Sequence, residues 1–378
     1  MGRAPVSERD DAVRSLRVAL LSPAFWPEVR RGGERVVAEL AEGLLLSGHS
    51  VRVLTSHPGR PLTRTERGVP VVRNWRPPDR WLRARQLEDY LTHVPFTYWS
   101  LRAGDDDLAH AVFATDALAA ARWSRRTGRP SIFTFTGIPD RAGLLDRRRR
   151  LEIALRAVAG CSAFVVLSRA AARAAERWLG AEARVIPPGV DLEAFAPGDG
   201  RGEAPTIFCP AAIDDPRKGL ASLLAAFQSV RREHPDARLL LSRPSERLAR
   251  SLAAEPGVEL ADQVHEPVQL APHYRRAWVT ALPSVGEAFG VVLTESLACG
   301  TPVVGSPWGG IPEIIDRPEV GRVAPSLQPA DLARALLEAL ELVAAPGTSE
   351  ACRARAGDFS TAAATAAYEA LYLELLGG

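Results

Sequence analysis

The sequence has no long apolar run, few cysteines and almost no lysine. No stretch reaches the roughly 18 consecutive apolar residues of a membrane-spanning helix, so we expect no transmembrane segment. The first 15 residues are polar and charged and lack the apolar core of a signal peptide, which predicts a disordered lead-in and a cytoplasmic protein. The four cysteines have neither a CxxC nor a zinc-type spacing, so we expect reduced thiols in or near the core: Cys161, Cys209, Cys299 and Cys352.

Two further absences exclude classes of enzyme. The seven histidines form no HxxxH pattern, and Asp105, Asp106 and Asp107 resemble a solvated turn rather than a metal-binding acid pair, so we expect no metal site. The sequence has no GxGxxG, and no acid follows the second predicted strand where a ribose would need one. A dinucleotide-dependent dehydrogenase is therefore disfavoured.

The net charge is only +2, but the two halves carry opposite signs. Residues 1–190 hold 31 arginines against 20 acidic residues, whereas the remainder holds 16 basic and 25 acidic residues. This asymmetry has two interpretations. The charges either help two domains face each other, or the first half meets something anionic, such as a phosphorylated acceptor or an acidic membrane surface.

Short apolar runs alternate with longer amphipathic ones, which predicts βα units and parallel sheets. Residues 16–22 and 51–56 are expected strands on either side of a helix over 33–48, and 57–67 is an expected turn-rich loop. Residues 187–205 are dense in Pro, Gly and acids, and the βα pattern restarts after them, so we expect a linker there. The sequence thus predicts an α/β protein with two parallel-sheet domains and a ligand cleft between them.

Residues 283–310 are the most informative stretch. Glu287 stands in a loop before a predicted helix over 288–300, and Glu295 lies about two turns into it, so both carboxylates can point into one cleft. The unpaired amides of Phe289, Gly290 and Val291 at the helix start suit phosphate or sugar oxygens. The alternative is a surface helix with a stabilising acid before its N-terminus.

Two other loops carry candidate phosphate contacts. Lys218, the only lysine, follows Arg217 at the start of a predicted helix, where the pair could clamp a diphosphate. Gly32 and Gly33 precede the first predicted helix and could cradle phosphate at its N-terminus. The alternatives are a solvated loop pair and a plain turn.

Together these stretches resemble the retaining glycosyltransferase family 4 over almost the whole chain. Glu287 and Glu295, with seven residues between them, match the E-x7-E motif of that family within EAFGVVLTESLACGTPVVGSPWGGIPEII. Its linker, phosphate-lysine and N-terminal segments are matched by IPPGVDLEAF, PRKGLASLLAAF and GGERVVAELAEGLLLSGHSVRVLT.

The resemblance implies the GT-B fold: Rossmann-like domains over 1–190 and 191–360 facing a central cleft, and a helix over 361–378 that crosses back to the first domain. It implies a retaining, metal-independent enzyme without a bound cofactor. Such an enzyme moves a hexosyl sugar from a nucleoside-diphosphate sugar, UDP- or GDP-linked, to a hydroxyl acceptor.

The resemblance also implies roles for residues. Glu295 would hold the ribose hydroxyls, Glu287 would contact the transferred sugar, and Lys218 would neutralise the departing diphosphate. The catalytic set would be Glu287, Lys218 and Thr136, and the donor set Gly32, Gly33, Arg217, Lys218, Glu287, Phe289, Gly290, Val291 and Glu295. Two positions depart from the family pattern: Ala212 stands where an Arg is common, and Thr136 where a His is common.

The acceptor is expected on the first domain, with His110 and Thr136 as candidate contacts; the alternative for His110 is a core or surface residue. Aromatic residues within 74–102 and the arginines of 147–150 could form a pocket for a bulky acceptor or a lipid-surface patch, or simply a packed helical hairpin. The expected partners are a nucleotide sugar and a small-molecule or lipid-linked acceptor, which an anionic group would suit, with peripheral contact at the inner membrane face and no nucleic acid.

Two rival functions use the same donor site. One is a nucleotide-sugar epimerase or hydrolase, which would release free sugar without an acceptor. The other is a catalytically weakened nucleotide-sugar-binding protein, which Ala212 and Thr136 motivate and which would bind nucleotide without turnover.

Overall fold

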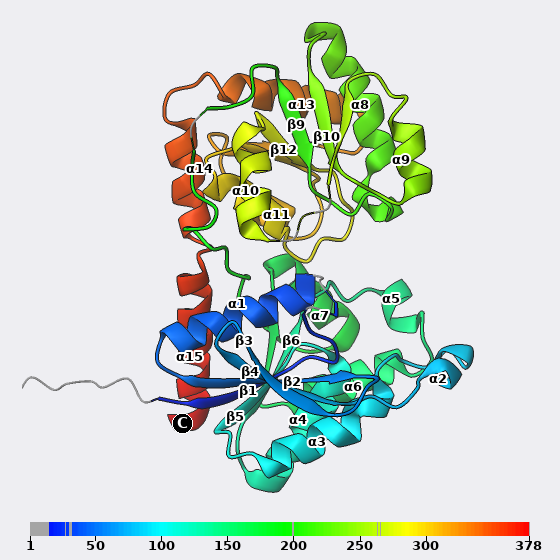
Figure 1. Ribbon diagram of the computed structural model, residues 1–378, viewed down its shortest axis with the longest axis vertical. Coiled ribbons are helices and arrows are strands. Elements are labelled where there is room, and N and C mark those ends of the chain that lie inside the picture. Colours follow the sequence, from blue (N-terminus) through cyan, green and yellow to red (C-terminus); the bar gives the residue numbers. More distant parts are fainter. Residues whose placement is uncertain are drawn as a thin grey trace, which may run out of the picture.

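The structure is a computed structural model that describes residues 15–26, 28, 29, 32–198, 200–262, 264 and 266–377. The lead-in expected at the N-terminus falls almost entirely outside these residues. The chain forms two α/β domains stacked one above the other, each built on its own sheet (Figure 1). The structure confirms the two-domain α/β fold class.

The first domain contains an eight-stranded sheet of order β3-β4-β2-β1-β5-β6-β7-β8. Its strands are β1 (Arg17–Leu21), β2 (Ser50–His57), β3 (Leu62–Glu66), β4 (Val69–Trp75), β5 (Leu108–Ala111), β6 (Ser131–Phe135), β7 (Ala163–Val166) and β8 (Arg184–Val185). Its helices are α1 (Gly32–Leu46), α2 (Arg80–Ala84), η1 (Leu91–His93), α3 (Val94–Ala103), α4 (Ala114–Thr127), α5 (Arg141–Leu145), α6 (Arg150–Gly160) and α7 (Arg169–Leu179).

The strand β3 was not expected, because residues 57–67 were predicted to be a loop. It pairs antiparallel with β4 through a tight reversal at Arg67 and Gly68, which both have positive φ. Its three central side chains are exposed, so it has none of the apolar runs from which the other strands were predicted.

The second domain contains a six-stranded parallel sheet of order β11-β10-β9-β12-β13-β14. Its strands are β9 (Thr206–Cys209), β10 (Arg238–Ser242), β11 (Val258–Ala261), β12 (Val279–Leu282), β13 (Val303–Gly305) and β14 (Gly321–Val323). Its helices are η2 (Pro216–Lys218), α8 (Leu220–Glu233), α9 (Glu246–Leu252), α10 (Pro267–Arg276), α11 (Val291–Ala298), α12 (Ile311–Ile314), α13 (Pro329–Leu342) and α14 (Thr348–Gly357). The predicted boundary at residue 190 falls between the two sheets.

The last helix, α15 (Thr361–Gly377), returns to the first domain and packs beside α1 (Figure 1). Its side chains Tyr368, Leu371 and Tyr372 are buried in the core that β1 and α1 build. The helix therefore completes the first domain, as expected.

The chain crosses between the domains twice, and the two crossings lie side by side. The Val190 amide donates to the Phe359 carbonyl at 2.8 Å, and the Thr361 amide donates to the Val190 carbonyl at 3.0 Å. A Cβ on Gly189 would come within 2.6 Å of the Thr361 Cα, so this close approach requires glycine. The two connecting segments are thus hydrogen-bonded to each other where the domains meet.

Candidate functional site

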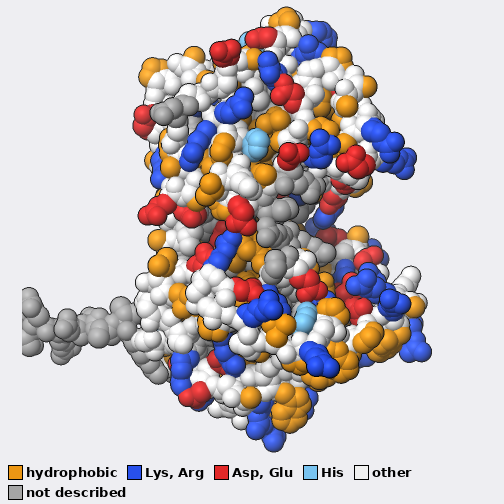
Figure 2. Space-filling model, in the orientation of Figure 1, with side chains coloured by type: hydrophobic (Ala, Val, Ile, Leu, Met, Phe, Trp, Pro, Cys, Tyr) orange, Lys and Arg blue, Asp and Glu red, His pale blue; other side chains and the backbone are white. Residues whose placement is uncertain are grey.

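A cavity of about 410 Å³ lies between the domains. Figure 2 shows the surface hollowed between the two lobes on the right of the view. The first domain contributes Gly32 and Gly33 at the start of α1 and Thr136 after β6. The second domain contributes Ala212, Arg217, Lys218, Glu287, Phe289, Gly290 and Val291. Loops at the carboxyl ends of both sheets therefore surround one space, which is where open α/β sheets bind ligands.

Lys218 and Glu287 form an ion pair on the wall of this cavity. Lys218 ends the short helix η2, which begins because Asp215 accepts a hydrogen bond from the Arg217 amide at 2.9 Å. The next residue, Gly219, has a φ of +70°, and a Cβ there would overlap the Pro283 carbonyl oxygen. The glycine therefore allows the lysine loop to lie directly against the loop that leads to Glu287.

Arg217 lies on the same cavity but is already occupied. Its guanidinium pairs with Asp215 at 2.6 Å, and its side chain is 70% exposed. This pairing lowers the pKa of the Asp215 carboxyl below its usual value. A ligand anion would have to compete with Asp215 for this arginine.

The helix α11 begins later than expected, at Val291 rather than 288. Phe289 and Gly290 therefore precede the helix, and Gly290 turns the chain into it with a φ of +118°. The first amides of a helix have no partner within it and lie at the positive end of its dipole. Phe289, Gly290 and Val291 line the cavity together with Lys218, an arrangement that suits an anionic ligand.

Glu295 does not line the cavity, although its spacing from Glu287 predicted that it would face the cleft. Its side chain is 0% exposed and forms an ion pair with Arg35 of α1, while the Tyr274 hydroxyl donates to its Oε2 at 2.5 Å. Burial, together with the nearby carboxylate, raises the pKa of Tyr274 well above its usual value. The carboxylate is thus held by both domains and is closed to ligand in this conformation.

Arg35 is a site residue that was not predicted from the sequence. It extends from α1 across the cleft and also contacts Glu39 at 2.7 Å. Burial raises the pKa of the Glu39 carboxyl to about 7 against the opposing effect of Arg35. A sequence signal was present, because Arg35 and Glu39 are four residues apart on one helix face.

The expectation that His110 contacts an acceptor is wrong. His110 is fully buried in β5, and its two ring nitrogens lie 2.7 Å from the Tyr372 hydroxyl and 2.7 Å from the Thr134 hydroxyl. Burial lowers the pKa of His110 to about 3, so the ring is neutral. His110 thus anchors α15 to the first sheet and is a core residue, which was one of the alternatives expected from the sequence.

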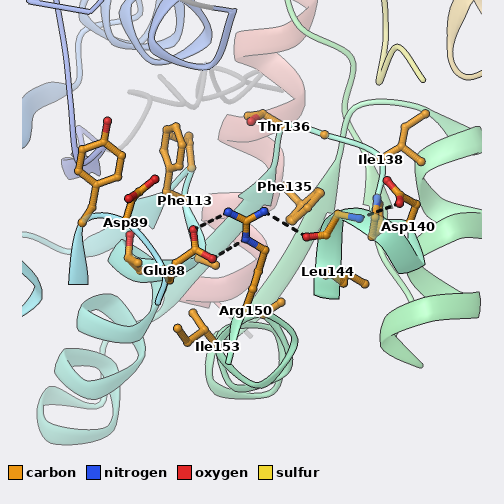
Figure 3. A pocket seen from close by; sticks show the side chains of 18 residues that line it. Glu88, Asp89, Phe113, Phe135, Thr136, Ile138, Asp140, Leu144, Arg150 and Ile153 are labelled. Carbon is orange, nitrogen blue, oxygen red and sulfur yellow. Dashed lines mark hydrogen bonds and ion pairs between the residues drawn. The ribbon is translucent and has the colours of Figure 1, made fainter. Parts of the chain in front are cut away.

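Thr136 joins the cleft to a second cavity of about 370 Å³ in the first domain, since Thr136 and Gly137 line both. The close-up in Figure 3 shows Phe113, Phe135, Ile138 and Arg150 among the side chains that line it. The Arg150 guanidinium contacts both carboxylate oxygens of Glu88 and donates to the Gly143 carbonyl at 3.1 Å. The cavity therefore offers apolar walls with fixed polar groups, which is typical of a small-molecule site.

Further polar contacts between the described residues join the two domains. Glu313 of α12 accepts hydrogen bonds from the Arg169 and Ala170 amides at 3.0 and 2.8 Å, so the second domain caps the N-terminus of α7. Arg67 pairs with Glu266 at 2.8 Å across the same interface. The closed cleft is thus stabilised by specific polar contacts between the two domains.

Within the described residues, no cluster of three or more His, Cys, Asp or Glu side chains is arranged to hold a metal ion. The four cysteines are free. The part of the chain that the structure describes contains no helix with the length and apolar character needed to cross a membrane.

Two family descriptions match the chain, one per domain. Residues 30–194 match "Glycosyltransferase Family 4", and residues 204–342 match "Glycosyl transferases group 1". The chain is 30% identical to a D-inositol 3-phosphate glycosyltransferase of an Arthrobacter species over 82% of each protein. It is 35% identical to the enzyme of that name from Segniliparus rotundus, over 51% of this chain and 47% of that relative's length.

Solved structures show the same fold. Sucrose-phosphate synthase from Thermosynechococcus elongatus superposes with a TM-score of 0.79 at 22% identity, over 96% of this chain and 99% of the other. Anabaena HepE in complex with UDP superposes with a TM-score of 0.74 at 16% identity, over 95% and 100%. The fold is thus the GT-B arrangement of two facing parallel-sheet domains.

Proposed function

The chain belongs to glycosyltransferase family 4, and from that premise we propose that it transfers a hexosyl group from a nucleoside-diphosphate sugar to a hydroxyl acceptor. We further propose that the reaction retains the anomeric configuration and needs no metal or bound cofactor. The observation that carries the proposal is the cavity between the domains, where Gly33, Lys218, Glu287 and the start of α11 surround one space.

The donor diphosphate is proposed to lie between Gly33 and Lys218. Gly33 has no side chain to block close approach from the first domain, and the residues before and at the start of α11 line the same space. As the bond to the sugar breaks, negative charge grows on the departing diphosphate. A lysine and fixed amides stabilise that charge without a metal.

The ion pair between Lys218 and Glu287 suggests how the donor enters. A diphosphate that takes over Lys218 releases the Glu287 carboxylate, which is then available to accept hydrogen bonds from the sugar hydroxyls. Without ligand, each group satisfies the other, so neither charge is left unpaired. Arg217 provides a second cation at the rim if it leaves Asp215.

The ribose is proposed to bind Glu295, which requires Arg35 to withdraw. Arg35 belongs to α1 of the first domain and Glu295 to α11 of the second, so parting of the domains separates them. The donor would therefore enter an opened cleft, and the cleft would close over it. A UDP-linked donor is the first candidate, since HepE, which shares the fold, binds UDP.

The acceptor is proposed to occupy the second cavity, with its hydroxyl near Thr136. This residue lies where the two cavities meet, so a group bound beside it faces the donor sugar. The relatives named for D-inositol 3-phosphate are compatible with a small polyhydroxylated acceptor. A threonine hydroxyl can donate or accept a hydrogen bond but does not carry the charge of an imidazole.

A thermal-shift screen of UDP, GDP, ADP and TDP and their sugars tests the donor site. One nucleotide should raise the unfolding temperature of the wild type, and Lys218→Ala and Glu295→Ala should each lose that shift. Arg247→Ala, an exposed change on α9, is the matched control and should keep it. No shift with any nucleotide would contradict the proposal.

Product analysis separates the proposed transferase from its rivals. Sugar transferred to an added polyol supports the transferase, whereas free sugar formed equally without acceptor supports the hydrolase. A thermal shift with no turnover on any acceptor supports a binding protein. The Glu295 carboxylate motivates this alternative, because its pairing with Arg35 closes it to ligand in this conformation.

A further inference from the structure

A hollow of about 400 Å³ on the first domain, away from the cleft, is lined by six residues from α3 and α4. These residues, called here the arginine pocket, are Tyr98, Trp99, Arg102, Arg122, Arg125 and Arg126. Figure 2, viewed as Figure 1, shows Arg or Lys side chains beside hydrophobic ones over α3 at the lower end of the molecule. Four guanidinium groups thus share one concave surface.

The positive charge of this pocket is not balanced by carboxylates. Within the described residues, none of its four arginines forms an ion pair with an acidic side chain, and no acidic residue lines it. Other cavities of the same protein carry both signs: Arg150 faces Glu88 in the second cavity, and Lys218 faces Glu287 in the cleft. The imbalance is therefore local and is not explained by the general abundance of arginine.

Helix dipoles account for only part of this arrangement. Arg102 lies in the last turn of α3, and Arg125 and Arg126 lie in the last turn of α4, where the negative end of a helix favours cations. Each helix end is equivalent to about −0.5 charge, so two ends offset roughly one of four positive charges. About three charges remain, and they repel one another across the hollow.

Two aromatic rings give the pocket a rigid wall. The Arg122 guanidinium lies 4.5 Å from the centre of the Tyr98 ring, and the neighbouring Arg102 lowers the pKa of the Tyr98 phenol. Tyr98 itself is buried in the core, so it fixes the position of both arginines. Trp99 beside them is 63% exposed.

We propose that the arginine pocket binds a phosphate group, carried either by a soluble phosphorylated compound or by the headgroup of an anionic lipid. Guanidinium groups match the oxygens of phosphate with paired hydrogen bonds, and the negative charge of a phosphomonoester or phosphodiester offsets part of the uncompensated positive charge. An exposed tryptophan beside the arginines suits a ligand with an apolar portion.

The pocket is separate from the proposed donor and acceptor sites. The first residues of α4 line the second cavity, whereas Arg125 lies 11 residues further along the helix, about 17 Å away at 1.5 Å per residue. Phosphate bound here therefore does not contact the reacting groups. Donor binding should be unaffected by changes in the pocket, so a failure of this proposal is distinguishable from a failure of the proposed function.

The test compares Arg122→Gln/Arg126→Gln with the matched control Arg247→Gln/Arg250→Gln, which removes the same charge from exposed positions of α9. One arm measures binding of inorganic phosphate by equilibrium dialysis at constant ionic strength. The other measures sedimentation with phosphatidylglycerol–phosphatidylcholine vesicles and with pure phosphatidylcholine vesicles. Nucleotide thermal shifts are recorded for all proteins.

The wild type and the control should bind in at least one arm. The pocket variant should bind about 25-fold more weakly, since each of its two lost arginines contributes roughly a factor of five near an anionic surface. Binding in both arms, or in the phosphate arm alone, identifies a soluble phosphate, and binding to phosphatidylglycerol vesicles alone identifies a lipid headgroup. No binding by the wild type in either arm, or an equal loss in both variants, would overturn the proposal.

Discussion

Arg35 of the first domain and Glu295 of the second form a buried ion pair across the cleft. Glu295 was predicted from the sequence to bind the ribose, whereas Arg35 was given no role. The pair stabilises the closed conformation and covers the Glu295 carboxylate at the same time. Ligand entry and domain opening are thereby linked through one contact.

Replacing Arg35 with Met should lower the thermal stability of the free protein but strengthen nucleotide binding. Removal of one partner leaves a buried carboxylate unpaired, which costs about 3–5 kcal/mol in the closed state. The same change removes a competitor for Glu295. Calorimetry and nucleotide titration check this, and weaker nucleotide binding by Arg35→Met would show that Arg35 itself contacts the ligand.

Replacing Gly219 with Ala should destabilise the protein and abolish nucleotide binding, because the new Cβ would overlap the Pro283 carbonyl and move the Lys218 loop. Gly180→Ala is the matched control, since Gly180 also has positive φ but nothing lies within 4 Å of a Cβ there. The control should cost about 1 kcal/mol, from backbone strain alone, and Gly219→Ala about 3 kcal/mol or more. Equal losses in urea unfolding would contradict the predicted overlap.

Stability should depend on pH through His110. Its pKa is lowered from 6.5 to about 3 in the folded protein, so between these values the unfolded chain holds a proton that the folded chain does not. The free energy of unfolding should therefore fall by about 1.4 kcal/mol for each pH unit between 6.5 and about 3. The unfolding free energy of the wild type should therefore depend more steeply on pH than that of His110→Gln. Identical pH dependences would show that the His110 ring contacts water in the folded protein, which would contradict the prediction.

Replacing Glu313 with Ala should open the cleft. The change removes both hydrogen bonds to the N-terminus of α7 from the other domain. A helix cap contributes about 1 kcal/mol, enough to shift a closed population several-fold toward open. Small-angle scattering should show a larger radius of gyration for Glu313→Ala than for Glu319→Ala, an exposed acid of the same domain. Equal radii would contradict the prediction that Glu313 holds the cleft closed.

Features that depend on neighbouring residues were predictable. The alternation of apolar runs indicated both sheets, and the Gly32-Gly33 and Glu287 loops were placed correctly on one cleft, because strand ends and helix starts have local signals. The charged strand β3 was missed because its side chains alternate without an apolar face.

The sequence by itself determined the two parallel α/β domains and the loops that meet between them, since residue periodicity and turn residues act over a few positions. Only the tertiary structure decided which side chains meet: Lys218 with Glu287, Glu295 with Arg35, and His110 with Tyr372, which is 262 positions away. It also decided that arginines of two helices converge on one hollow. Such contacts arise from the packing of distant segments, on which local spacing carries no information.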